Sequence, residues 1–90
     1  MKKIFAWIVF ESEDHIPDQC RDNIRSYIDN CDSNVSIFDV YDNTTYSFII
    51  SVCDNDSNKR ESMYNSIKES LSNLISSIPV TVEERIKDTL

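Results

Sequence analysis

The pattern of apolar and polar positions changes its period along this chain. Residues 4–10 form a continuous apolar run, which is typical of a central strand buried on both faces. Residues 45–53 alternate instead, which predicts an antiparallel strand with one buried face. Its apolar face holds Tyr46, Phe48, Ile50 and Val52, and the other face holds Ser47, Ile49, Ser51 and Cys53.

Two further strands are predicted beside these. Residues 35–41 are rich in apolar and aromatic side chains, and Asp42-Asn43-Thr44 separates them from the alternating strand. Asn and Asp are good hairpin residues, which matters because the chain has no glycine. Residues 80–86 alternate again after Pro79, which predicts a final edge strand, since proline is tolerated where an edge strand begins.

Two segments have helical spacing. Pro17 stands at a typical helix start, and five apolar positions then recur on one arc: Cys20, Ile24, Tyr27, Ile28 and Cys31. The second helix is expected to begin at Asn58, with Glu61 completing a capping box, and to end before Pro79. Its apolar stripe is Met63, Tyr64, Ile67, Leu71, Leu74, Ile75 and Ile78.

The predicted order of elements is βαββαβ. This order is the split βαβ arrangement, so the expected fold is α+β and ferredoxin-like: a four-stranded antiparallel sheet with two helices on one face. Ninety residues predict a single domain over 1–90. Because this fold hosts many unrelated functions, function has to be argued from charge and from particular residues.

Charge is concentrated in one part of the chain. Residues 11–56 hold eleven of the sixteen carboxylates and only two cations, Arg21 and Arg25, which gives this stretch a net charge of −9. A concentrated negative field steers positively charged partners, whereas affinity for phosphates requires clusters of Lys and Arg. The composition therefore favours a basic protein as the partner and disfavours direct binding of nucleic acid.

Trp7 is a second candidate for partner binding. Only one face of a ferredoxin-like sheet is covered by helices, and Phe5, Trp7 and Val9 would point to the other face, with Ile49 beside them. A large exposed apolar patch usually marks an interface, and Trp is a frequent anchor there. The predicted partner-binding residues are therefore Asp18, Asp22 and Asp29 on the first helix, Asp39, Asp42 and Asp54 around the hairpin, and Trp7.

Several kinds of chemistry are excluded or disfavoured. Without glycine, the chain cannot build a phosphate-binding loop, a dinucleotide fingerprint or a nucleophile elbow. Cys20, Cys31 and Cys53 lack metal or redox spacing and are expected to be reduced thiols. The carboxylates of Glu11, Glu13 and Asp14 cluster with His15, the only histidine, but these residues lack a defined metal-ligand spacing. We therefore expect no metal, no cofactor and no catalytic residue.

The leading expectation is a small acidic protein of the inhibitor or immunity type, which binds and neutralises a basic, nucleic-acid-processing protein such as a toxin nuclease. The alternatives are a phage-type DNA mimic that blocks a host defence complex, a homodimeric regulatory or structural module, and a metal-dependent nuclease using Glu11 and Asp14. The apolar run 4–10 lacks a cleavage site, and no segment approaches the ~20 apolar residues of a membrane span, so a cytoplasmic location is expected.

Overall fold

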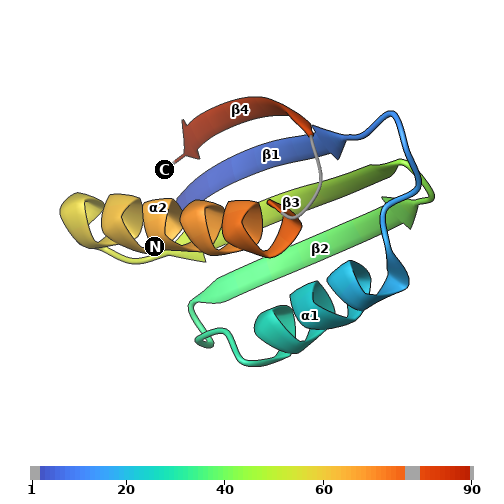
Figure 1. The fold of residues 1–90 in the computed structure, drawn as a ribbon. Coiled ribbons are helices and arrows are strands. Elements are labelled where there is room, and N and C mark those ends of the chain that lie inside the picture. The colour runs from blue at the N-terminus through green and yellow to red at the C-terminus, as the bar shows by residue number, and fades with distance from the viewer. Residues whose placement is uncertain (1–2, 77–79, 90) are drawn as a thin grey trace.

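The computed structural model describes residues 3–76 and 80–89, with side chains for 3–76 and 80–86. Its elements follow the order β1 (Lys3–Glu11), α1 (Asp18–Asp29), β2 (Val35–Asp42), β3 (Thr45–Cys53), α2 (Ser57–Ile75) and β4 (Thr81–Thr89). The four strands form one sheet in the order β2-β3-β1-β4, and each neighbouring pair is antiparallel. The α+β, ferredoxin-like fold is confirmed (Figure 1).

Both helices lie on the same side of the sheet, as Figure 1 shows. The core fills the space between the two layers and joins one face of β1 and β3 to Ile24 of α1 and to Leu71 and Ile75 of α2. The strands contribute Ile4, Ala6, Ile8, Phe10, Tyr46, Phe48, Ile50 and Val52 to this core. The apolar face predicted for residues 45–53 is thus the face that packs against the helices.

The prediction that β1 is buried on both faces is wrong. Its side chains alternate in exposure from Ile4 to Ile8, and Phe5 and Trp7 are 36% and 44% exposed, whereas Val9 on the same face is 8% exposed. Ala6 and Ile8, on either side of Trp7 in the sequence, are buried under the helices. Among the described residues no helix or loop covers the other face, so the apolar run of β1 serves the core on one side and the surface on the other.

The helical stripes are confirmed in their centres and differ at their ends. Cys20 and Ile24 of α1 are buried, whereas Tyr27 and Ile28 are partly buried and Cys31 lies beyond the end of the helix. The buried residues of α2 are Arg60, Tyr64, Ile67, Leu71 and Ile75, while Met63 and Leu74 pack against the core only in part. The predicted contribution of Ile78, and Pro79 as the stop, lie outside the described residues.

The start of α2 differs from the expected capping box. Asp56, and not Asn58, is the N-cap: its carboxylate accepts hydrogen bonds from the backbone N–H groups of Asn58 (2.9 Å) and Lys59 (3.3 Å). Asp is as good an N-cap as Asn. Because the cap lies two residues earlier, α2 begins at Ser57.

The β2–β3 turn fastens the loop that follows β1. Asn43 adopts a positive φ of 46°, the conformation that a tight hairpin needs and that Asn tolerates. The backbone carbonyls of Asn43 and Thr44 accept hydrogen bonds from the N–H groups of Ile16 (2.8 Å) and Ser12 (2.9 Å). The β1–α1 loop is therefore held against the hairpin turn, at one end of the sheet.

Each edge strand is tied to a helix by an ion pair, and the carboxylate of each pair also accepts a hydrogen bond from a tyrosine, which lies on β3 for one edge and on α2 for the other. On β2, the Asp39 carboxylate pairs with Arg25 of α1 (2.6 Å) and accepts a hydrogen bond from the Tyr46 hydroxyl (2.8 Å). On β4, Glu84 pairs with Lys68 (3.2 Å) and accepts a hydrogen bond from the Tyr64 hydroxyl (2.7 Å), both of α2. These contacts fix both edges of the sheet under the helix layer.

Stability should fall in alkaline solution because of these two tyrosines. Burial, and donation of a hydrogen bond to a carboxylate, raise the pKa of Tyr46 and Tyr64 above the ordinary value of 10.0. The unfolded chain therefore loses these protons first, and the folded state binds more protons as the pH rises above 10, so the free energy of unfolding decreases there. Below pH 10 both hydroxyls are protonated in the folded and the unfolded chain, so their full contribution to the free energy of unfolding is present.

Chemical denaturation at about pH 8 and about pH 11, on either side of the ordinary tyrosine pKa, checks this expectation. Tyr46→Phe removes one of these two hydroxyls, so its alkaline loss should be smaller than that of the wild type. An alkaline loss in Tyr46→Phe as large as that of the wild type would contradict the assignment to these hydroxyls.

Candidate protein-binding surface

The sheet face opposite the helices carries an ordered set of side chains. Side chains alternate along a strand, and residues paired across strands share a face. One row across the sheet is formed by Phe38 of β2, Ile49 of β3, Trp7 of β1 and Arg85 of β4. We term this surface the open face, and its residues are Lys3, Phe5, Trp7, Val9, Glu11, Ser36, Phe38, Val40, Asp42, Thr45, Ser47, Ile49, Ser51, Cys53, Thr81, Glu83 and Arg85.

The middle of the open face is apolar and exposed. Five large side chains there, termed the apolar centre, are at least 36% exposed: Phe5, Trp7, Phe38, Val40 and Ile49. A hollow of about 370 Å³ is lined by Phe5, Ala6, Trp7, Ile49 and two residues of β4. The Arg85 guanidinium lies over the Trp7 ring, 5.6 Å from its centroid, in a cation–π contact. An apolar patch of this kind usually marks an interaction site.

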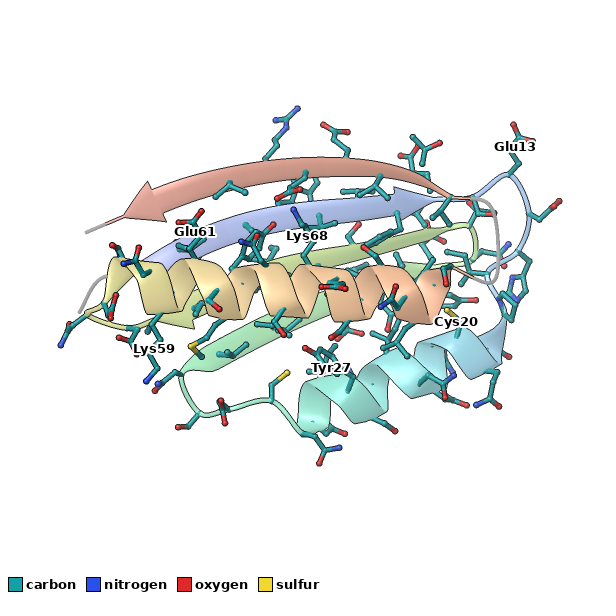
Figure 2. All side chains as sticks on the ribbon, turned by 60° about the vertical axis from the view of Figure 1, so that its left-hand side comes forward. Glu13, Cys20, Tyr27, Lys59, Glu61 and Lys68 are labelled. Atoms are coloured by element: carbon teal, nitrogen blue, oxygen red, sulfur yellow. The ribbon has the colours of Figure 1, made fainter. Side chains whose placement is uncertain are left out.

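Carboxylates gather where β1 and β2 meet the hairpin turn. Glu11 and Asp42 share the last row of the open face, next to the row that contains Glu83. The fastened β1–α1 loop adds further carboxylates at the same end, and Figure 2 shows Glu13 projecting outward from it. We term this set the acidic end; it comprises Glu11, Glu13, Asp14, Asp18 and Asp42.

The cations of residues 11–56 lie beside β2 and not on the open face. Arg25 pairs with Asp39, and Arg21 lies over the Tyr41 ring, 5.2 Å from its centroid. His15 hydrogen-bonds to the Asn43 side chain and lies 3.9 Å from Asp18, on the helix side of the acidic end. The open-face part of the acidic end therefore keeps a negative potential that a cationic partner would meet first.

The structure divides the seven predicted binding residues among several places. Trp7 and Asp42 lie on the open face, and Asp18 begins α1 at the acidic end, in the helix layer. Asp22 and Asp29 are exposed on α1, which belongs to the other layer. The six aspartates therefore do not form one continuous surface with Trp7.

Asp39 and Asp54 are occupied by contacts within the chain. Asp39 is on the helix side of β2, three positions before Asp42, and its side chain is 9% exposed. Asp54 follows β3 at the opposite end of the sheet, roughly 30 Å from the hairpin for a strand of nine residues. Its side chain, 17% exposed, accepts a hydrogen bond from the Asp56 N–H and lies 3.8 Å from Lys59.

The sequence reasoning missed Glu11 and Lys3 as parts of this surface. Counting in steps of two from Trp7 places Lys3 at one end of β1 and Glu11 at the other, on the same face. The Lys3 ammonium lies 4.4 Å from the centroid of the Phe5 ring, which agrees with this placement. The open face is therefore basic at one end of β1 and acidic at the other.

The remaining candidate groups have structural surroundings. The Cys20 thiol donates to the Leu74 carbonyl (3.1 Å), and burial raises the pKa of the Cys20 and Cys31 thiols, which disfavours the reactive thiolate. In the described part of the chain, no three His, Cys, Asp or Glu side chains converge as metal ligands would. Over the same residues, no helix is long and apolar enough to cross a membrane.

No family model and no curated protein sequence matches this chain. Among solved structures, it resembles the de novo designed protein LFR1 1 with ferredoxin fold (16% identity, 97% of this chain and 86% of that chain, TM-score 0.60). It also resembles the designed protein Foldit4 (12% identity, 98% and 99% coverage, TM-score 0.57). A third likeness is to a hydantoinase/carbamoylase family amidase from Burkholderia ambifaria (7% identity, TM-score 0.62), and this match covers 96% of this chain and 27% of the amidase chain. At these identities the likeness concerns the fold alone.

Proposed function

We propose that this chain is a small acidic binding protein of the inhibitor or immunity type, and that it captures a basic, nucleic-acid-processing protein with its open face and acidic end. The observation that supports this proposal is the apolar centre, which shares one surface with the carboxylates of Glu11 and Asp42. Buried aromatic anchors contribute most of the affinity in such complexes, and complementary charge accelerates their formation.

The chemistry of the surface defines the partner. An apolar patch beside at least two carboxylates fits a protein that presents an apolar group next to Lys or Arg side chains. A DNA mimic would instead need carboxylates spread along a surface, because duplex DNA carries one charge per ~1.7 Å of its axis. Here the open-face carboxylates are confined to one end, which favours an ordinary protein interface over a DNA mimic.

Removing charge from the acidic end should slow capture of the partner. Immobilised wild-type protein first isolates a basic partner from the source cell, and association is then followed by surface plasmon resonance. Glu11→Gln combined with Asp42→Asn should lower the association rate constant by about tenfold at low salt, and the difference should shrink as salt screens the field.

A matched control removes the same charge from α1. Asp22→Asn combined with Asp29→Asn also deletes two exposed carboxylates but leaves the open face unchanged. This pair should change the association rate much less than the open-face pair. Equal slowing by both pairs would mean that only the net charge matters, and an unchanged rate for the open-face pair would remove the acidic end from the interface.

A further inference from the structure

We infer that, without its partner, the open face binds a second copy of this chain in a two-fold symmetric dimer whose sheets face each other and whose β1 strands run antiparallel. The two copies would cover each other's apolar centre. The dimer itself follows from the open face alone; its consequence, that it masks the surface for a basic partner, rests on the proposed function.

The charges along β1 are self-complementary. Lys3 and Glu11 lie on the open face, each four residues or roughly 13 Å from Trp7. Consider a two-fold axis that lies between the two sheets, at right angles to the strands, and crosses β1 at Trp7. It places Lys3 of each copy over Glu11 of the other, and this contact forms twice because the interface is isologous. An axis along the strand would instead place Lys3 on Lys3 and Glu11 on Glu11, which like-charge repulsion opposes.

The same symmetry brings the apolar centre onto itself. The row that contains the axis holds Phe38, Ile49, Trp7 and Arg85, so its three exposed apolar side chains would pack against their own copies. Arg85 would also meet its own copy, and its ion pair with Glu83 (3.2 Å) offsets the like charge there. Four strands of about nine residues span roughly 30 by 20 Å at the usual strand spacings. This face is of the order of the ~800 Å² that each partner buries in a standard protein interface.

The carboxylates of the helix layer oppose dimerisation only weakly in this geometry. Asp22 and Asp29 lie on the helix layer, on the far side of the sheet from the second copy. Because packed layers are about 10 Å apart, these carboxylates are more than about 10 Å from the second copy. The Debye length is about 8 Å at physiological ionic strength, so their repulsion is screened. The contacts between Lys3 and Glu11 act at close range and persist.

Charge reversal gives a sharp test on the free protein. In sedimentation velocity and light scattering, the mass of the wild type should rise with concentration and reach twice the chain mass by about 1 mM. Lys3→Glu alone and Glu11→Lys alone each create two like-charge contacts, so each should raise the dimer dissociation constant at least about tenfold. An equimolar mixture of the two variants should dimerise again, because every reversed charge then meets its opposite.

Two controls complete the design. Asp29→Lys makes the same change as Glu11→Lys on α1 and should leave the dissociation constant close to that of the wild type. Trp7→Ala should favour the monomer, and circular dichroism should show that its fold is intact. A monomeric wild type would overturn the inference, as would single reversals that dimerise as tightly as the wild type or a mixture that stays monomeric.

The outcome is separable from that of the proposed function. The mass measurement uses no partner, so a monomeric wild type overturns the dimer and leaves the capture experiment unaffected. If the wild type dimerises as expected but both charge-deleted pairs associate with the partner equally slowly, the dimer is supported and the proposed capture surface is contradicted. If both hold, addition of the captured partner should dissociate the dimer.

Discussion

Leu71→Ala is expected to lower the free energy of unfolding by roughly 2–5 kcal/mol, through lost apolar transfer and the cavity left behind. Leu71 is fully buried on α2, among the core residues of β1 and β3. The outward side of α2 is rich in serine, a weaker helix former than alanine, so packing against the sheet stabilises this helix. A small domain has only about 5–15 kcal/mol in total, so the loss is a large fraction of it.

Urea denaturation measures this loss directly. Ser66→Ala, at an exposed position of the same helix, is the matched control and should change the free energy of unfolding by no more than about 0.5 kcal/mol. A loss below about 0.5 kcal/mol for Leu71→Ala would contradict the packing of α2 described above.

Trp7→Ala is expected to weaken binding of the basic partner by at least about 2 kcal/mol, or roughly thirtyfold in dissociation constant. Trp7 lies in the middle of the open face, where neighbouring side chains of the apolar centre would exclude water from the contact. Because its side chain is outside the core, the variant should remain folded.

Titration calorimetry with the captured partner gives the dissociation constants. Val82→Ala is the matched control, because Val82 is 47% exposed but pairs with Phe10 on the helix side of the sheet. It should bind like the wild type. Equal losses for Trp7→Ala and Val82→Ala would show that exposed apolar area in general, and not the open face, governs binding.

The fold could be predicted because its signals are local. The alternation over residues 45–53 matches β3 at both ends, and the helical stripe around Leu71 faces the core as expected. The apolar run in β1 was harder to interpret because it shows no alternation of apolar and polar residues. Such a run does not reveal whether the second face of the strand is buried or exposed. The exposure of Trp7 in the structure, where both helices lie on the other side of the sheet, shows that this face of β1 is not covered.

The candidate surface was only partly predictable because it depends on register. Asp39 and Asp42 are three residues apart on one strand, so they face opposite sides of the sheet, yet sequence proximity grouped them together. Asp42 and Glu11 are far apart in sequence, and antiparallel pairing through β3 brings them into one row. Trp7 was found because alternation along a single strand was sufficient to place it.

Mapping the bound partner by NMR tests the central claim most directly. In a titration of isotope-labelled protein with the captured partner, the account predicts the largest shift changes at Trp7, Phe38 and Ile49, with further changes at the acidic end around Glu11 and Asp42. Shift changes concentrated on α1 around Asp22 and Asp29, with the Trp7 indole signal unchanged, would contradict it.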